Sequence, residues 1–201
     1  MLDAIILARK NSKRLKNKNI KKLNKKRMID YTFEAALKSN KISRIYCFTD
    51  DERIKKFTKN KKILFPLKRP KYLSKDNTKS SKTLLYFVKN LYKKKFISKN
   101  FILLQPTSPL RSTKNINSAI KLFEKKKIKY LASFKKDNLK KKSSNFAPDG
   151  SIYICNTKDF LKNKKIVPKQ AFPIFLNKKF TLDVDTMEDF KKAKKILNVN
   201  N

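Results

Sequence analysis

Short apolar runs alternate with longer amphipathic stretches along the chain, and this alternation constrains the fold more than any other feature. Runs of this kind are typical of buried strands, and apolar residues at i, i+4, i+7 spacing are typical of helices. The pattern predicts strands at Ala4–Leu7, Arg44–Phe48, Phe101–Leu104, Tyr130–Phe134 and Ser151–Cys155, with further edge or antiparallel strands at Lys62–Phe65 and Phe180–Leu182. It predicts helices at Met28–Ser39, Asp51–Lys59, Lys79–Lys93, Thr113–Lys125 and Thr186–Leu197, with Thr113 and Thr186 as N-caps. Strands linked by helices indicate an α/β fold, doubly wound around a mostly parallel central sheet, and no linker divides residues 1–201 into more than a single domain.

Several residue types that often form active sites are rare or missing, and this narrows the possible chemistry. The chain has no His, which excludes Ser-His-Asp catalysis, and its two Cys, in the runs IYCF and IYIC, are predicted to be ordinary buried strand residues. Gly occurs once, at Gly150, so neither a GxGxxG fingerprint nor a Walker A loop can be present. Any phosphate site must therefore consist of side chains and non-glycine backbone.

The chain is strongly basic, with 54 Lys+Arg against 15 Asp+Glu and a formal charge of +39. Such a charge attracts polyanions, which leaves open a nucleic-acid-binding protein. However, the Lys residues are spread along the whole chain, which favours a Lys-biased surface without a specific nucleic-acid partner. The start, MLDAIILARK, lacks an apolar segment long enough for a signal or a membrane span, so a cytoplasmic location without membrane contact is expected.

The loop after the first predicted strand is unusually cationic. Residues 9–19 contain six Lys or Arg together with Ser12 and Asn19 as hydrogen-bond donors. Ligands bind at the carboxyl ends of strands in doubly wound sheets, so this loop is suited to a triphosphate. Only seven Arg occur, and four fall in predicted strand-end loops or turns, where a bidentate donor differs from Lys: Arg9, Arg14, Arg69 and Arg111.

An acidic cluster near the other end complements this loop. Four of the fifteen acidic residues lie within residues 183–189. In an extended segment Asp183 and Asp185 point to the same side, which suits Mg²⁺ held by carboxylates and substrate phosphates. Glu188 and Asp189 are instead expected to complement the N-terminal dipole of the following helix.

Further polar residues lie beside predicted strand and helix ends. Gln105 ends a buried strand just before a turn bracketed by Pro106 and Pro109. Ser80 and Ser81 precede or open the third predicted helix, where they could simply cap it.

In this order the segments resemble the acylneuraminate cytidylyltransferases, the CMP-sialic acid synthetases, and their relatives for legionaminic and pseudaminic acids. The resemblance runs nearly end to end and rests on six motifs: AIILARKNSKRLKNKNI, FTDDERI, KRPKYLSKDNTKSS, ILLQPTSPLRS, APDGSIYI and LDVDTMEDF. It implies a Rossmann-like nucleotidyltransferase domain over residues 1–201, with a shortened insertion near 135–147. In the family that insertion helps to bind the sugar and to form the dimer, so a homodimer remains an open alternative.

The resemblance also implies a reaction and residue roles. The reaction is transfer of CMP from CTP to the anomeric hydroxyl of a nonulosonic acid, with release of pyrophosphate and with Mg²⁺ as cofactor. The implied catalytic residues are Arg9, Lys18 and Asp185. The implied binding residues are Arg9, Ser12, Lys18, Asn19, Arg69, Ser80 and Ser81 for CTP, Gln105 for the sugar, and Asp183 with Asp185 for the metal.

Two other functions remain as alternatives. One is the related 3-deoxy-manno-octulosonate cytidylyltransferase, whose first loop typically resembles ARxxSTRLPGKPL rather than NSKRLKNKN. The other is a non-catalytic basic protein that binds nucleic acid on the same fold.

Overall fold

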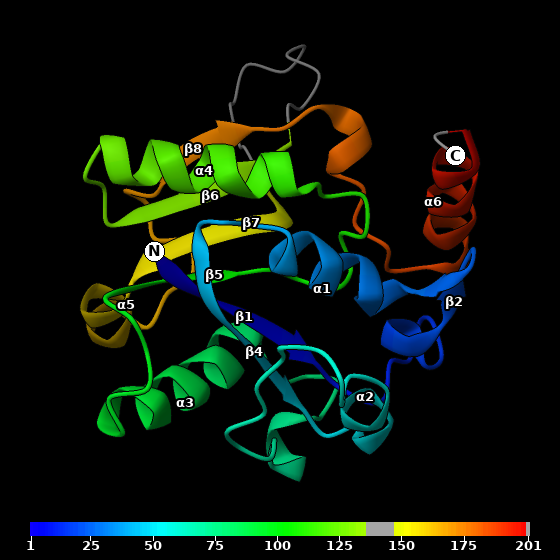
Figure 1. Ribbon diagram of the computed structural model, residues 1–201, viewed down its shortest axis with the longest axis horizontal. Coiled ribbons are helices and arrows are strands. Elements are labelled where there is room, and N and C mark those ends of the chain that lie inside the picture. Colours follow the sequence, from blue (N-terminus) through cyan, green and yellow to red (C-terminus); the bar gives the residue numbers. More distant parts are fainter. Residues whose placement is uncertain (136–146, 200–201) are drawn as a thin grey trace.

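The computed structural model describes residues 1–135 and 147–199, which form a six-stranded sheet, a two-stranded ribbon and six α-helices (Figure 1). The strands are β1 Leu2–Ala8, β2 Lys22–Leu23, β3 Lys26–Arg27, β4 Ile42–Thr49, β5 Asn100–Leu103, β6 Tyr130–Phe134, β7 Pro148–Asn156 and β8 Phe172–Phe175. The helices are α1 Met28–Leu37, α2 Glu52–Phe57, α3 Ser80–Lys93, α4 Thr113–Lys125, α5 Thr157–Asn163 and α6 Met187–Val199. Short 3₁₀ turns occupy Lys18–Ile20, Lys71–Leu73 and Lys178–Phe180.

The central sheet has the strand order β4-β1-β5-β7-β6-β8, and β7 alone among these six strands runs against the others. This arrangement confirms the predicted α/β fold with a mostly parallel sheet. Strands β6 and β7 are consecutive among the described strands and pair antiparallel.

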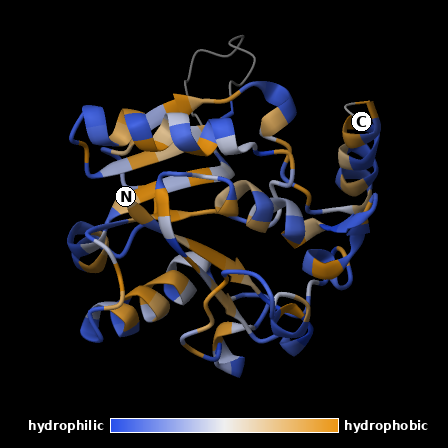
Figure 2. Ribbon diagram, in the orientation of Figure 1, coloured by the Kyte–Doolittle hydropathy of each residue, from blue (hydrophilic) through white to orange (hydrophobic). Residues whose placement is uncertain are grey.

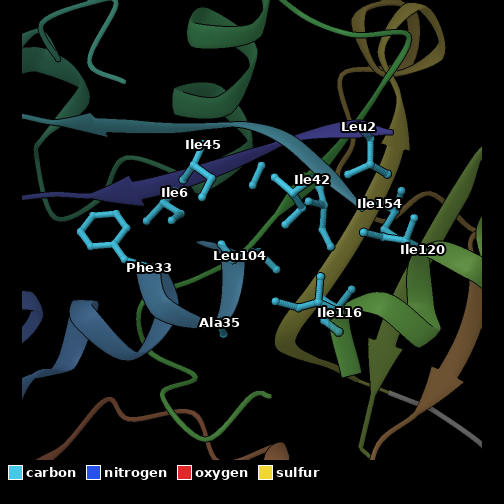
Figure 3. Close-up of a cluster of buried hydrophobic side chains, with 14 of the residues drawn as sticks. Leu2, Ile6, Phe33, Ala35, Ile42, Ile45, Leu104, Ile116, Ile120 and Ile154 are labelled. Atoms are coloured by element: carbon cyan, nitrogen blue, oxygen red, sulfur yellow. The ribbon is translucent and has the colours of Figure 1, made fainter. Parts of the chain in front are cut away.

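Helices cover both faces of the sheet. On one face α1 and α4 pack on the strands, and Figure 3 shows Phe33 and Ile116 from these helices facing Ile6, Ile45 and Ile154 from the strands. On the other face α3 and α5 bury a second, aromatic-rich layer that includes Phe87, Phe101 and Phe160. In Figure 2 the central strands are mostly hydrophobic, whereas the helices carry alternating hydrophobic and hydrophilic bands. Two such layers are what amphipathic helices need on a sheet that is buried on both sides.

A third, smaller cluster attaches α6 to the β2–β3 ribbon, beside which α6 stands in Figure 1. Its buried members are Leu15, Leu23, Met28, Val184, Phe190 and Ala193. Leu15 belongs to the cationic loop, and Val184 lies between Asp183 and Asp185, the two carboxylates predicted to hold Mg²⁺. The cluster therefore holds two distant segments together.

Several predicted boundaries need correction. The strand predicted at Lys62–Phe65 is a single bridge between Leu64 and Tyr46. In the segment Phe180–Leu182, Phe180 ends a 3₁₀ turn and the next two residues form no strand. Ser112, not Thr113, caps α4, because its hydroxyl accepts the hydrogen bond from the backbone N–H of Asn115. The predicted cap Thr186 is confirmed by the 3.2 Å bond that it accepts from the Asp189 N–H. The sequence pattern did not reveal β2, β3, α5 or β8.

Two further predictions concern the shortened insertion and membrane contact, and both stay predictions. Most of the shortened insertion at 135–147 lies outside the described residues. No helix within the described part of the chain is long and apolar enough to cross a membrane.

Candidate active site

A cleft of about 460 Å³ lies where the carboxyl ends of β1 and β5 meet. From β1 the chain crosses over one face through α1, and it reaches β5 over the opposite face through α3, so this is the point where the winding reverses. Nine of the ten residues expected to form the site line this cleft: Arg9, Ser12, Lys18, Asn19, Arg69, Ser80, Gln105, Asp183 and Asp185.

Ser81 is the exception among the expected site residues. It lines a neighbouring hollow together with Tyr72 and Lys82. Of these two serines, the first two residues of α3, only Ser80 lines the cleft. A contact between Ser81 and CTP therefore stays a prediction.

The cationic loop keeps its shape without glycine. Asn17 takes a left-handed conformation, with φ of 55°, which Asn tolerates better than most residues. The side-chain amide of Asn19 donates to the carbonyl of Arg9 at 2.9 Å, and Arg53 donates to Asn17 Oδ1 at 3.0 Å. Asp50 accepts a 2.8 Å bond from the backbone N–H of Lys10. These bonds hold the loop open around the cleft.

Asp185 is held by two cations from this loop. Its Oδ1 lies 2.6 Å from Lys18 Nζ, and its Oδ2 lies 2.6 Å from a terminal nitrogen of Arg14. Burial alone would raise the pKa of Asp185, but the hydrogen bond and charge of Lys18, together with Arg14, outweigh burial and lower it. Asp185 is therefore a carboxylate at neutral pH.

Asp183 differs from Asp185 in its partners. Its Oδ1 is buried and has no hydrogen-bond partner among the described residues. Burial, reinforced by the charge of Asp185, raises the pKa of Asp183. A buried carboxylate oxygen without a partner is costly, and a bound cation would relieve that cost.

The other side of the cleft holds a second ion pair that the sequence did not single out. Asp76 Oδ1 lies 2.7 Å from Arg9 Nη1, and its Oδ2 lies 3.8 Å from Lys13 Nζ. Asp76 precedes α3, so this contact joins the cationic loop to the turn that carries Ser80. The one feature of the sequence that could have indicated Asp76 is that it is an acidic residue in a strongly basic chain.

Arg69 lies in the wall of the cleft. It donates a 2.6 Å bond to the carbonyl of Leu73, and burial lowers its pKa to about 10, so it is charged at neutral pH. Its Nε is buried without a hydrogen-bond partner among the described residues.

Gly150 lies next to Gln105 and Asp183, two of the residues that line the cleft. It has φ of 84°, a value that side-chain-bearing residues rarely adopt. A Cβ at this position would lie 3.7 Å from Gln105 Oε1 and 3.6 Å from Asp183 Oδ2. The backbone conformation, rather than a lack of space, therefore explains why the one glycine of the chain is here.

A cationic cleft at the reversal point of a doubly wound sheet defines a nucleotide-binding α/β protein. Residues 4–199 match the family model described as cytidylyltransferase, and the chain belongs to this family. The resemblance found in the sequence is thereby confirmed.

Curated relatives that match more than nine-tenths of the chain are 25–30% identical to it. The chain is 30% identical to an N-acylneuraminate cytidylyltransferase from Escherichia coli, over 94% of this chain but only 50% of that protein. It thus spans about half the length of that relative. It is 26% identical to a CMP-N,N'-diacetyllegionaminic acid synthase from Legionella pneumophila, over 98% of this chain and 96% of that protein.

Solved structures share the fold at lower identity. A CMP:2-keto-3-deoxy-manno-octonic acid synthetase complexed with CTP superposes with a TM-score of 0.73 at 15% identity, covering 99% of both chains. A cytidylyltransferase from Leptospira borgpetersenii gives a TM-score of 0.69 at 16% identity, over 98% of this chain and 86% of that one. These matches confirm the Rossmann-like nucleotidyltransferase fold.

Proposed function

We propose that the protein transfers CMP from CTP to the anomeric hydroxyl of a nonulosonic acid and releases pyrophosphate. The single observation that carries this proposal is the cleft in which a cationic loop faces Asp183 and Asp185. Relatives named for sialic, legionaminic and pseudaminic acids support the choice of acceptor.

The triphosphate would lie along the cationic loop. Arg9, Ser12 and Lys18 would contact its oxygens, and the carboxylates of Asp76 and Asp185 hold the two cations, Arg9 and Lys18, in place beforehand. Phosphate oxygens would then replace carboxylate oxygens on the same donors. Preorganised cations of this kind stabilise charge that grows in the transition state.

The nucleoside and the acceptor would occupy opposite ends. Arg69 and Ser80 would read cytosine, and Asn19 Oδ1 would accept from a ribose hydroxyl because its amide nitrogen is bonded to Arg9. Gln105, beside Gly150, would hold the acceptor sugar. The oxygen of the anomeric hydroxyl would then attack the α-phosphorus and lose its proton to solvent, while the bond between the α-phosphorus and pyrophosphate breaks.

We propose Mg²⁺ as the cofactor, held by Asp183 and Asp185. The unpartnered Oδ1 of Asp183 fits a hard cation. The described residues contain no cluster of three or more acidic, His or Cys ligands, so phosphate oxygens and water would complete the coordination. When bound, the ion would neutralise charge on the phosphate oxygens.

A second acceptor, 3-deoxy-manno-octulosonate, is favoured by one specific observation, the TM-score of 0.73 with the synthetase for that sugar. The identity to that structure is 15%, against 26–30% to the sialic and legionaminic acid relatives, so we place the nonulosonic acids first.

Pyrophosphate release with CTP, Mg²⁺ and a panel of 2-keto-3-deoxy acids tests the proposal. The panel includes sialic, legionaminic and pseudaminic acids beside 3-deoxy-manno-octulosonate, and Asp185→Asn serves as the inactive control. We expect CMP-sugar formation with at least one nonulosonic acid. Turnover only with 3-deoxy-manno-octulosonate would support the second acceptor, and no turnover with any of them would overturn the proposal.

A further inference from the structure

Arg111 is a buried arginine that no role assigned above explains. Its side chain is 2% exposed, yet the guanidinium makes three hydrogen bonds. Nη1 donates to the carbonyls of Gln105 at 3.2 Å and Ser151 at 2.8 Å, and Nη2 donates to Thr32 Oγ1 at 2.9 Å. The three acceptors belong to the segment after β5, to β7 and to α1. One side chain thus joins three elements beneath the end of the cleft where the acceptor sugar is proposed to bind.

The charge of Arg111 is kept at a cost. Burial lowers the pKa of its guanidinium to about 9, and Asp149 is the carboxylate whose charge acts against this. Arg111 forms no ion pair within 4.0 Å among the described residues. Buried charges are often no better for stability than apolar side chains of similar volume. The hydrogen-bond geometry that Arg111 provides therefore explains its presence better than a contribution to the stability of the fold.

Asp149 forms a hydrogen bond to Ser151 as well, but to its N–H group rather than to its carbonyl. It is buried, and its Oδ1 accepts from the Ser151 N–H at 2.8 Å and from the hydroxyl of Ser133. The peptide of Ser151 is thus bonded through its N–H to Asp149 and through its C=O to Arg111. Gly150, which lies against Gln105 and Asp183, is the residue between Asp149 and Ser151, so the bond between these two residues spans it.

We propose that Arg111 is a positioning residue that fixes the backbone of Gln105 against β7 at Gly150, and so sets the binding geometry of the acceptor sugar. This inference rests on the proposed function. The two arms of the guanidinium bond the carbonyls of Gln105 and Ser151 and the hydroxyl of Thr32 at once, which the single ammonium of Lys does not reproduce with the same directions. Arg111 itself lies below the cleft and touches neither substrate.

Arg111→Lys is the main test because it keeps the charge. We expect the KM for the acceptor to rise about tenfold, the loss typical of removing hydrogen bonds to a charged group. The Kd for CTP, measured by calorimetry without acceptor, should stay within about twofold. The matched control is Arg44→Lys, since Arg44 is also held by hydrogen bonds, to Asp3 and Ser98, but at the opposite edge of the sheet. It should change neither constant.

A second variant distinguishes a loss of sugar positioning from a folding defect. Thr32→Val removes the acceptor of Nη2 and the 3.5 Å bond that the Thr32 hydroxyl donates to the Gln105 carbonyl. It leaves the guanidinium and its bonds to both carbonyls in place, so the variant should fold and raise the acceptor KM by a smaller factor in the same direction. Hydrogen exchange gives a readout independent of turnover. Gln105 accepts from the Ser108 N–H at 3.3 Å as well as from Arg111, so the Ser108 amide should exchange faster in both variants.

The outcomes separate the two proposals. An active wild-type enzyme whose Arg111→Lys and Thr32→Val variants keep their acceptor KM and Ser108 exchange would overturn the positioning role alone. Equal losses of CTP affinity and acceptor affinity would also overturn it, because they indicate a general structural role. A wild-type enzyme inactive on every acceptor would overturn the proposed function first, and the inference with it.

Discussion

Lys18 Nζ lies 2.6 Å from Asp185 Oδ1, although 167 residues separate them in the chain. The contact joins the loop after β1 to the acidic segment before α6. It places a cation suited to phosphate beside a carboxylate suited to a metal, at the edge of one cleft. The small cluster around Leu15 and Val184 supports this contact from behind.

Asp185→Asn should lower Mg²⁺-supported turnover by about 10²-fold or more, the usual loss when a charge-stabilising group is removed from an active site. Folding should stay intact because Asp185 lies at the rim, and circular dichroism checks this. The matched control is Glu188→Gln in the same segment, whose partner is the exposed Lys192. A near wild-type rate for Asp185→Asn at saturating Mg²⁺ would show that the metal assignment is wrong.

Arg9→Ala should raise the KM for CTP and lower kcat, because contacts that tighten as charge moves in the transition state affect both. Steady-state kinetics with varied CTP measure the two constants. Lys16, in the same loop but exposed, provides the control, and Lys16→Ala should change little.

The Lys16 variant also tests specificity within the loop. Lys18 is 14% exposed and bonded to Asp185, so Lys18→Ala should resemble Arg9→Ala. Equal effects at Lys16 and Lys18 would indicate that only diffuse charge matters and would favour polyanion binding.

Salt dependence should distinguish the CTP site from the general charge of +39. Binding of duplex DNA or RNA should fall steeply as salt rises from about 50 to 300 mM, because it depends on counterion release. Binding of CTP should fall much less, since bidentate and partly buried contacts are screened less than exposed Lys. Titrations of both ligands across this range measure the difference. Tight, selective nucleic-acid binding at high salt without CTP binding would favour the binding-protein alternative.

Asp51→Asn should reduce the free energy of unfolding by about 1 kcal/mol at pH 7, a modest figure because Arg53 is partly exposed. Burial opposes ionisation of Asp51, but hydrogen bonds from Arg53 outweigh it and lower its pKa. The stabilisation is therefore complete above about pH 4, the pKa of an unfolded Asp, and is lost as pH falls through the lower pKa of the folded state.

Urea unfolding at pH 7 and at successively lower pH measures this difference. Asn caps helices as well as Asp does, so the substitution isolates the charge. Glu52→Gln, at a more exposed carboxylate, is the control. A difference that does not shrink toward low pH would show that the cap rather than the charge is responsible.

Local patterns sufficed where an element is stabilised by its own residues. The five main strands and five of the helices follow from apolar runs and helical spacing, and the cleft residues follow from motifs at strand ends. The antiparallel direction of β7 did not follow, because an apolar strand reads the same in either direction and its pairing with β5 and β6 is a long-range contact. Likewise, Ser80 and Ser81 look equivalent in the sequence, and only the structure shows that Ser80 lines the cleft whereas Ser81 lines a neighbouring hollow.

The sequence by itself determined the fold class, the family resemblance and the chemical character of the site, since these depend on residue types and their order. Tertiary structure alone decided which charges meet. Asp76 bonds Arg9, Asp185 bonds Lys18, and Arg111 lies beneath the cleft instead of lining it. Such contacts depend on how loops from distant strands converge at one edge of the sheet, and no local spacing encodes that geometry.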